Sequence, residues 1–430
     1  MDLITQALSL VKKIYHHPDL RRKFAFTAFI FAIYRFMAHI PAPGVDINRL
    51  SNLFAANQFL NLLNIFAGGT LARFSLVALG ISPYITASII MQLAGMVIPK
   101  IKELQKEGES GQEQVNQYTR LLTVPLAIIQ SISVILLLKS QNLIAVGDWL
   151  AMAALVSSIV AGALIIMWLG ELISEKGIGN GISMILFAGI VSQIPTAASQ
   201  LGISLGSDQS LVIITMILLT LVIIGLMVFM NEAIRKVPIQ YAKRQRGSRI
   251  YGGQTTFLPI RVNTSGVMPI IFAISIMMIP AFLGRLMMAT SNEKLVDIGQ
   301  KITTWFGNTA FAYMIIYFLI VFAFSYLSAI IFFNTDDISD ELKKSGAFIP
   351  GIRPGNATKK HLDYIVSRIT FIGGIFLGFI AILPSLVQRF TGIQSLAIGG
   401  TSALIVVAVI LEVAKQVESM LVEQNYDKYR

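Results

Sequence analysis

The sequence predicts an all-α polytopic membrane protein with about ten transmembrane helices, and three observations support this. The chain of 430 residues is 55% hydrophobic and only 13% charged, about half the charged share of an ordinary soluble domain. Its apolar residues gather in ten segments long enough to cross a bilayer. Its basic residues are concentrated in alternate connections between those segments, which indicates a fixed orientation in the membrane.

The ten spans follow from the length that a bilayer requires, about 20 mostly apolar residues each. This criterion places them near 24–40, 74–98, 121–138, 149–170, 181–199, 211–230, 266–283, 309–333, 369–388 and 396–414. Several contain proline, namely Pro83, Pro125, Pro269 and Pro384. Membrane helices tolerate proline because neighbouring helices and waters satisfy the freed backbone groups.

The orientation of the spans is predicted from the Lys and Arg residues. Of these 34 residues, 26 lie in the N-terminal segment, the even-numbered connections and the C-terminal tail, 7 lie in the odd-numbered connections, and Arg35 lies inside the first span. Because basic residues accumulate on the cytoplasmic side, both termini are expected in the cytoplasm. The N-terminal segment 1–23 is basic and amphipathic and has no small-residue cleavage site, so no removable signal peptide is expected.

The connection at 195–210 has no basic residue and divides the chain into two sets of five spans. The expected domains are the cytoplasmic segment 1–23, a first half at 24–200, a second half at 201–414 and a cytoplasmic tail at 415–430. An odd number of spans per half forces the second half to run inverted relative to the first, as in inverted-repeat transporters and channels.

Three long cytoplasmic connections, 99–120, 231–265 and 334–368, are rich in Lys and Arg. One interpretation is a topology signal that also contacts anionic lipids. The other is docking, because 231–265 interleaves its basic residues with Tyr241 and Phe257. Such a hairpin-like basic finger suits a nucleic acid or an acidic protein surface.

The segment 51–73 is too polar to cross the membrane, yet its part 59–69 is apolar and ends in two glycines. A short half-apolar helix of this kind lies at membrane depth only if protein buries it or if it lines a cavity. The alternative is an interfacial helix on the outer leaflet.

The sequence shows no catalytic or metal-binding pattern. It has no cysteine, which excludes disulfides and thiolate metal sites. The ionisable residues within or beside the spans are Arg35, Glu171 and Glu412, without a carboxylate pair at mid-span. The glycines of 177–181 lack the spacing of a phosphate-binding loop and suit a tight turn between two helices. We therefore expect no enzyme activity, no cofactor and no metal.

Several long stretches resemble the signatures of the SecY family of protein-translocation channels, from about residue 20 to about residue 420. They are GISPYITASIIMQL at 80–93, WLGELISEKGIGNGIS at 168–183, YAKR at 241–244, KKSGAFIPGIRPG at 343–355 and GGTS at 399–402. The resemblance implies ten helices in two inverted five-helix halves around a central hourglass pore. It is closest to the bacterial type, although plastid relatives are similar.

The resemblance also implies four groups of functional residues. A collar of bulky aliphatic side chains would close the pore at Ile81, Ile85, Ile182, Leu186, Ile271 and Ile405. A plug at 59–70 would lie under that collar with Leu62, Leu63, Ile65, Phe66, Gly68 and Gly69. A lateral gate between spans two and three and spans seven and eight would carry Thr86, Gln130 and Asn263. Docking residues in the cytoplasmic loops would be Lys243, Arg244, Arg246, Arg249 and Arg353, whereas Ser248 replaces a basic residue common in the family.

The implied function is a channel subunit that passes unfolded secretory proteins across the bacterial plasma (inner) membrane and releases hydrophobic segments sideways into lipid. The implied partners are the membrane subunits SecE and SecG, the motor ATPase SecA, the ribosome, preproteins with their signal sequences, and anionic lipids. A thylakoid location is the alternative. A secondary transporter would predict ion-binding residues at mid-span, and a membrane enzyme would predict clustered polar residues at the end of a span. The sequence offers neither pattern.

Overall fold

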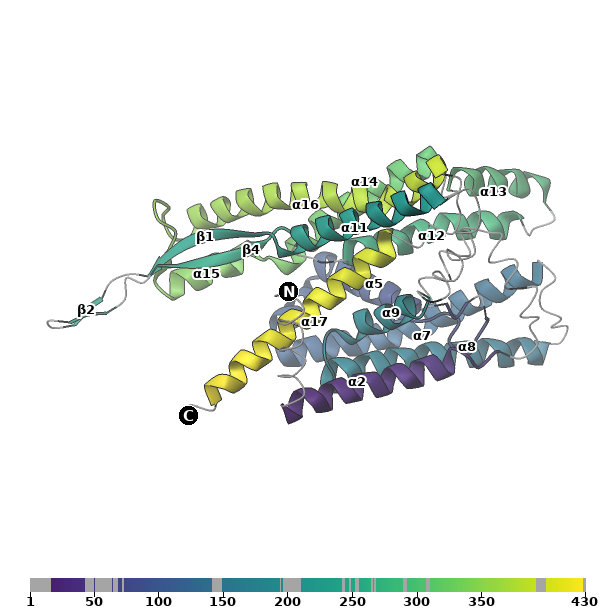
Figure 1. Ribbon diagram of the computed structural model, residues 1–430, viewed down its shortest axis with the longest axis horizontal. Coiled ribbons are helices and arrows are strands. Elements are labelled where there is room, and N and C mark those ends of the chain that lie inside the picture. Colours follow the sequence, from purple (N-terminus) through teal and green to yellow (C-terminus); the bar gives the residue numbers. More distant parts are fainter. Residues whose placement is uncertain are drawn as a thin grey trace. The chain divides into compact units, whose positions relative to one another are not determined.

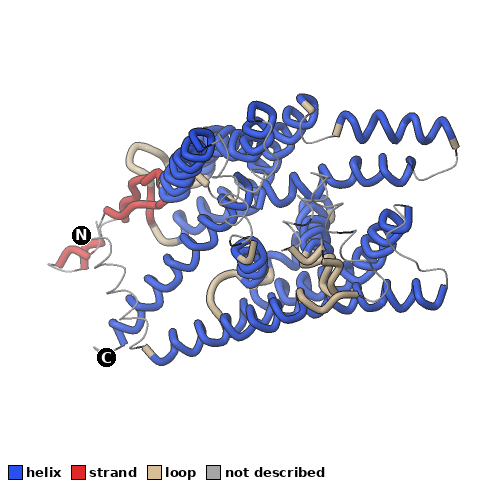
Figure 2. Tube along the Cα trace, turned by 45° about the vertical axis from the view of Figure 1, so that its right-hand side comes forward, coloured by secondary structure: helices blue, strands red, loops and turns tan. Residues whose placement is uncertain are grey.

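The computed structural model describes residues 17–42, 50, 64, 69–71, 73–140, 149–193, 195, 210–241, 244–246, 249–251, 255–263, 266, 268–288, 292–306, 310–391 and 400–427. Helices account for most of these residues (Figure 1), which confirms the predicted all-α class. The few strands lie together in one region of the trace (Figure 2).

Each of the ten predicted spans overlaps a helix, although the fifth, expected at 181–199, is matched only by a helix that ends at Val191. These helices are α2 (Pro18–Met37), α5 (Ser82–Val97), α7 (Glu109–Ser140), α8 (Trp149–Lys176), α9 (Gly181–Val191), α11 (Ser210–Glu232), α12 (Met268–Met288), α14 (Phe311–Phe332), α16 (Asn356–Thr391) and α17 (Gly400–Asp427). Within the described residues, 4 helices are by themselves long and apolar enough to cross a membrane, or up to 5 if one bent pair counts as a span. The total of ten crossings therefore stays a prediction.

The second predicted span differs from its expected bounds at both ends. Helix α5 begins only at Ser82, because residues 73–80 form turns in which Gly80 has a φ of 55°. Pro83, in the first helical turn, has a φ that is already set for a helix. After Val97 the chain bends by 107° into α6 (Pro99–Lys106), since Pro99 lacks the N–H that would continue the helix.

The chain divides into two compact units. The first comprises Met1–Ile213, Ile279–Asn308 and Ile405–Arg430, and the second comprises Ile214–Met278 and Thr309–Leu404. Helix α12 contributes its first part to the second unit and its last turns to the first. The predicted halves at 24–200 and 201–414 stay a prediction.

In the first unit, α7 packs between α5 and α8, and α8 also contacts α9 and α2. The turns at 73–80 complete the apolar core of this unit, because their backbone packs directly against α8. A Cβ atom on Gly162 would be 2.0 Å from the carbonyl oxygen of Leu76. Phe74, buried in the same core, is the one described non-glycine residue with positive φ, at 42°.

In the second unit a three-stranded antiparallel sheet extends from the helices. It consists of β1 (Ile234–Tyr241), β4 (Thr255–Arg261) and β5 (Ala347–Phe348) in the order β4-β1-β5. Further along the same connection, β2 (Arg244–Arg246) pairs with β3 (Arg249–Tyr251). Figure 1 shows β2 at the far end of this extension. The hairpin-like finger expected in 231–265 is therefore present.

Helices α14 and α16 form the largest helix pair of the second unit. Their axes approach closely because α16 has glycine at two positions four residues apart, which is a small-residue packing pattern of membrane helices. A Cβ on Gly374 would be 3.0 Å from the ring of Phe322, and one on Gly378 would be 2.7 Å from the ring of Phe318. The two phenylalanine rings stack on each other.

Candidate functional site

The predicted collar residues of the first unit stand on two helix N-termini. Ile81 and Ile85 are one turn apart at the start of α5, and Ile182 and Leu186 are one turn apart at the start of α9. Ile81, Ile85 and Leu186 are buried and Ile182 is half-buried. Residues four positions apart lie on one face of a helix, so each helix presents its pair of aliphatic side chains in one direction.

The other two predicted collar residues are also buried. Ile405 lies in α17 of the first unit and Ile271 lies in α12 of the second unit, with 0% and 6% of their surfaces exposed. Because the six residues belong to two units, their assembly into a ring stays a prediction.

Two glycines hold α8 and α9 together beneath these side chains. A Cβ on Gly181 would be 1.7 Å from the carbonyl oxygen of Gly170, so only glycine fits at the start of α9. A Cβ on Gly170 would lie 3.3 Å from Cδ1 of Ile185 and 3.6 Å from Cδ1 of Ile81. The isoleucine of α5 therefore packs over the point where α8 meets α9.

The loop between α8 and α9 is the tight turn that the sequence predicted. Gly179 has a φ of 79°, in the left-handed region that glycine enters without steric cost. Asn180 caps α9, because its Oδ1 accepts hydrogen bonds from the backbone N–H groups of Ile182 and Ser183 at 3.1 and 3.3 Å.

Three more side chains satisfy the backbone N–H groups of this loop. The N–H of Ile178 donates to Thr27 Oγ1 of α2 at 3.2 Å. The N–H of Gly179 donates to Gln416 Oε1 of α17 at 2.6 Å, and that of Gly181 donates to Ser174 Oγ of α8 at 2.9 Å. An apolar cluster of Leu20, Ile178, Val417 and Leu421 surrounds the turn. The positions of Ile182 and Leu186 thus depend on α2 and α17, which come from opposite ends of the chain.

The arginine inside the first predicted span and the glutamate at the end of the fourth both make contacts within the first unit. Arg35 Nη1 donates to Ser192 Oγ at 2.9 Å, which ties α2 to the end of α9. Arg120 Nε lies 2.7 Å from Glu171 Oε1, which ties α7 to α8. The side chain of Arg120 is half exposed, so this ion pair is partly screened by solvent.

Most of the predicted plug lies outside the described residues, namely Leu62, Leu63, Ile65, Phe66 and Gly68. Gly69, near the end of the predicted plug, is described. Gly69 has a φ of 79° and donates its N–H to the carbonyl of Asn64 at 2.7 Å. A Cβ there would be 3.5 Å from the side chain of Gln193, near the end of α9. Gly69 therefore forms a turn close to the end of α9.

The predicted gate residues make different kinds of contact. Thr86 donates its hydroxyl to the carbonyl of Ser82 in its own helix at 3.0 Å, and Gln130 is half-buried in α7. Asn263 Nδ2 donates to Asn231 Oδ1 at 2.7 Å, which links the end of α11 to the chain just before α12. Its own Oδ1 is buried without a protein donor.

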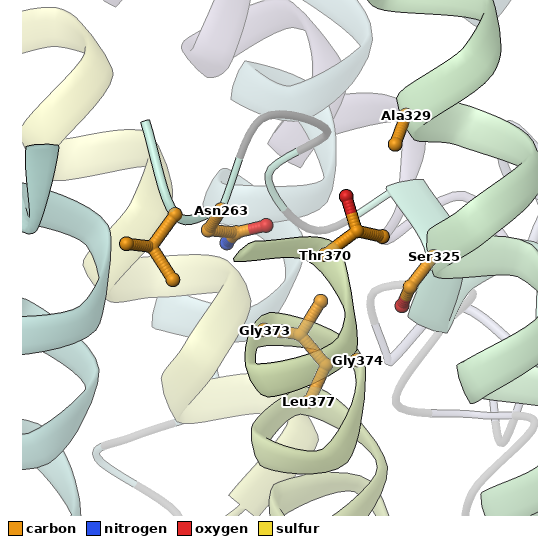
Figure 3. Close-up of a pocket in the computed structure, with 8 residues that line it drawn as sticks. Asn263, Ser325, Ala329, Thr370, Gly373, Gly374 and Leu377 are labelled. Atoms are coloured by element: carbon orange, nitrogen blue, oxygen red, sulfur yellow. The ribbon is translucent and has the colours of Figure 1, made fainter. Parts of the chain in front are cut away.

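Asn263 also lines a pocket of the second unit (Figure 3). The pocket is small and partly open to the surface. Its lining residues are Val262, Asn263, Ser325, Ala329, Thr370, Gly373, Gly374 and Leu377. The chain at 262–263 can lie against α16 because Gly373 has no side chain, since a Cβ there would be 2.8 Å from the carbonyl oxygen of Val262. The pocket is therefore a small gap with polar and apolar lining beside a predicted gate residue.

The predicted docking residues lie in two connections that share one sheet. Strand β5 of the 334–368 connection pairs with β1, so that Gln240 lies opposite Phe348 and Tyr241 opposite Ala347. Val237, Ile260, Ile349, Leu362 and Val366 form an apolar core beneath the sheet. From the sequence the two basic connections were expected to be separate loops, whereas in the structure both contribute strands to one sheet.

The basic residues themselves occupy the projecting parts of this element. Arg244 and Arg246 lie in β2 and Arg249 lies in β3, where Arg246 pairs with Arg249 in the strand register. Lys243 lies outside the described residues. Arg353 is exposed in the turn before α16, and its carbonyl accepts a hydrogen bond from Thr358 Oγ1 at 2.9 Å.

An ion pair stabilises the base of that turn. Lys359 Nζ lies 2.5 Å from Oδ1 of Asp336 at the start of α15 (Thr335–Lys344). The hydrogen bond to this carboxylate raises the pKa of Lys359. Ser339 in α15 donates its hydroxyl to the carbonyl of Gly355 at 2.9 Å. The turn that carries Arg353 is thus attached to both α15 and α16.

Comparison with known proteins decides the family. The sequence model of the SecY family matches residues 75–414. The chain belongs to the SecY family. A protein translocase subunit SecY from Mycobacterium tuberculosis is 40% identical over 430 residues, covering 96% of this chain and 97% of that protein. The SecY of Streptomyces lividans is 41% identical with the same coverage.

Solved structures share the SecY fold at low sequence identity. One described as the structure of a protein-conducting channel has a TM-score of 0.62 at 17% identity and covers 93% of this chain and 92% of that chain. One that reports on the plug domain of SecY has a TM-score of 0.60 at 18% identity with the same coverage. The Sec61 of a canine ribosome-channel complex has a TM-score of 0.58. The fold expected from the sequence signatures is therefore confirmed.

Sequence reasoning missed several residues that position the SecY-type site. Gly170 and Gly181 stand in the quoted signature, but their mutual contact was not inferred. Thr27 and Gln416 are single polar residues in helices at opposite ends of the chain. Their signal was weak because a lone Thr or Gln in a membrane helix is common, and only the fold reveals which backbone group each one reaches.

Proposed function

We propose that this chain is the channel subunit of a protein translocase, which passes unfolded secretory proteins across the membrane. The observation that carries the proposal is the 40% identity to named translocase subunits over 96% of this chain. The channel is passive, and energy for transport comes from the motor ATPase SecA or from elongation on the ribosome. The chain itself has no enzyme activity.

In this proposal the aliphatic residues Ile81, Ile85, Ile182, Leu186, Ile271 and Ile405 form the constriction of the pore. A narrow apolar collar excludes water when it is empty, which blocks ions. The same side chains move around a passing polypeptide without making strong contacts. The pairs on α5 and α9 support this role, because each presents two bulky aliphatic residues from a helix start that close packing holds in place.

The segment 59–70 acts as the plug of the resting channel, with Leu62, Leu63, Ile65 and Phe66 as its apolar face and Gly68 and Gly69 at its base. The positive φ of Gly69 supports a sharp turn at that base. A turn with no side chain is a suitable pivot because glycine has the widest conformational freedom.

The lateral gate carries Thr86, Gln130 and Asn263. An apolar signal sequence leaves the pore through this gate into lipid, with about 0.8 kcal/mol gained for each CH₂ group that is buried. Weak polar contacts suit a seam that opens, since hydrogen bonds between membrane helices contribute only about 0.6 kcal/mol on average. The environment of Asn263 supports this role, because its Oδ1 is buried without a protein donor and borders a small pocket.

The sheet formed by both basic connections is the docking surface for SecA and the ribosome. Lys243, Arg244, Arg246 and Arg249 contact the partner from the finger, and Arg353 contacts it from the adjacent turn. The shared sheet supports a single surface, because β5 attaches the second connection to the finger. Further partners are the membrane subunits SecE and SecG, preproteins and anionic lipids. The chain resides in the bacterial plasma membrane with both termini in the cytoplasm.

The function is tested by translocation into proteoliposomes. The vesicles contain this chain with its cognate SecE and SecG, and they receive SecA, ATP and a labelled preprotein. We expect ATP-dependent protection of the preprotein from added protease. Absence of protection, in vesicles where a known SecY complex works in parallel, would refute the channel proposal.

The docking surface is tested in the same vesicles with two variants that change charge equally. Arg353→Gln should strongly reduce protection, because it removes an exposed cation from the docking turn. Lys344→Gln removes an exposed cation at the end of α15 in the same connection and should retain most of the activity. Equal effects of both variants would mean that net charge, and not Arg353, governs docking.

A further inference from the structure

Helix α13 (Glu293–Trp305) is not explained by the channel function. It has 13 residues, too few to cross a bilayer. It begins at a proper cap, since Asn292 Oδ1 accepts a hydrogen bond from the N–H of Lys294 at 3.1 Å. It follows α12 in the chain, and Figure 1 shows it beside the last turns of that helix. The surroundings of each face of this helix indicate its role.

One face of α13 is fixed against α12 by a contact between two glycines. A Cβ on Gly299 would be 2.5 Å from the carbonyl oxygen of Gly284, and a Cβ on Gly284 would be 3.1 Å from that of Gly299. Thr303, one turn after Gly299, is also close to Gly284, with its Oγ1 2.9 Å from such a Cβ. Backbones this close leave α13 little freedom to move relative to the end of α12.

A second face of α13 is charged. Lys301 Nζ lies 2.7 Å from Asp297 Oδ2, one turn away, and both side chains are exposed. Glu293 lies a further turn before Asp297 and is also exposed. Residues four positions apart share a face of a helix, so this row of charges faces away from the packed glycine.

The third face is apolar and exposed. Ile298 and Trp305 are seven residues apart, which places them on one side of the helix, and 45% and 65% of their surfaces are exposed. Trp305 also lies one turn after Lys301, so the apolar side borders the charged row at the end of the helix. The last turns of α12 also expose apolar side chains, because Leu283 and Met288 are 51% and 40% exposed. Helix α13 and the last turns of α12, a predicted membrane span, thus both expose apolar side chains.

We propose that α13 is an interfacial helix that lies in the leaflet at the C-terminal end of α12, with Ile298 and Trp305 inserted among the upper acyl chains. This placement rests on the proposed function only in that α12 crosses the membrane. A helix with a charged face and an apolar face containing Trp is the type that lies in the plane of the interface. Tryptophan favours this depth because its ring is apolar and its N–H is polar. Through the Gly284–Gly299 contact, α13 sets the depth of the end of α12.

The proposal is tested by the fluorescence of Trp305 in the full chain. The protein has 3 tryptophans, so Trp149→Phe with Trp168→Phe leaves Trp305 as the single reporter. The chain is reconstituted in phosphatidylcholine vesicles that carry bromine at a shallow or a deep position of the acyl chain. We expect strong quenching by shallow bromine, weaker quenching by deep bromine and little quenching by iodide in water.

A second single-tryptophan variant provides a matched control. Trp149 begins α8 and is 78% exposed, so it reports the depth of a helix end in the same bilayer. Quenching of Trp305 by iodide and not by bromine would overturn the proposal in favour of a solvated helix. Quenching of Trp305 by neither would overturn it in favour of contact with protein, provided that Trp149 responds to shallow bromine.

A pair of substitutions tests which face of α13 meets the lipid. Ile298→Glu places a charge on the apolar face and should shift the emission of Trp305 to the red and reduce its quenching by bromine. Gln300→Glu places the same charge on an exposed position of the polar side and should change neither value. Equal shifts in both variants would refute the assigned face. Translocation assays are separate from these measurements, so failure of either proposal is recognised independently of the other.

Discussion

The backbone of Gly181 at the start of α9 lies directly against the backbone of Gly170 in α8. A Cβ atom on Gly181 would be 1.7 Å from the Gly170 carbonyl oxygen, a distance that no pair of non-bonded atoms adopts. Helices α8 and α9, which flank the turn at 177–180, can therefore pack backbone to backbone only because neither glycine has a side chain. Ile182 and Leu186 follow immediately, so the contact also sets where the proposed collar residues of α9 lie.

The first prediction concerns this contact. Gly181→Ala should destabilise the folded protein by about 1–3 kcal/mol, the usual cost of overpacking, because α9 must move away from α8. Thermal unfolding of the purified protein in detergent measures the effect. The control is Gly225→Ala in α11, where a new Cβ meets no atom within 4 Å. That change should leave stability unchanged or raise it by up to about 1 kcal/mol, since alanine favours helix. Equal unfolding temperatures for both variants would contradict the prediction.

The second prediction concerns the hydrogen bond from the N–H of Ile178 to Thr27. Thr27→Val keeps the shape of the side chain but removes the acceptor, which leaves a buried N–H without a partner. The expected loss of stability is about 1–3 kcal/mol. Thr27→Ser restores the oxygen and should recover most of that loss. The same unfolding assay distinguishes them, and a Ser variant as unstable as the Val variant would assign the effect to packing alone.

The third prediction concerns the ion seal of the proposed collar. Ile85→Asn places an amide in a ring that depends on excluding water, so the resting channel should conduct ions in planar bilayers. Ile85→Leu keeps the apolar surface and should remain closed. Ile89→Asn changes a buried residue one turn further along α5 and reports on polarity outside the collar. Similar conductance in the two Asn variants would argue against a specific role for Ile85.

The fourth prediction concerns the ion pair between Lys359 and Asp336. Hydrogen bonding to the carboxylate raises the pKa of Lys359, so the contribution of the pair is fully present below the ordinary lysine pKa of about 10.4. It is lost as the pH rises through the raised value. At pH values from about 6 to 9, well below that pKa, the ion pair should therefore stay formed, and the attachment of the turn that carries Arg353 should not change with pH.

Chemical labelling measures this shift. An acylating reagent attacks only the neutral amine, so near pH 10, roughly the ordinary lysine pKa, Lys359 should react more slowly in the native protein than in Asp336→Asn. Mass spectrometry quantifies the modified peptide, with Lys344 as an internal reference. Equal rates in both proteins would show that the ion pair does not persist in solution.

The sequence predicted the helices well because hydropathy is a local property. Ten apolar segments each overlap a helix, and the glycine turn at 177–181 separates two of them as expected. The errors lie at ends such as residues 74–81, where apolar residues form buried turns. Hydropathy cannot distinguish a buried turn from a helix, since both exclude water.

The sequence by itself also determined the basic finger, the absence of cysteine chemistry and the signatures that assign the family. Only the tertiary structure decided that Gln416 reaches the N–H of Gly179, that β5 joins the finger and that Gly299 meets Gly284. Residues far apart in the chain make each of these contacts, and their geometry depends on how helices cross. No local pattern encodes that crossing. A glycine needed for close approach looks, in sequence, like any other glycine.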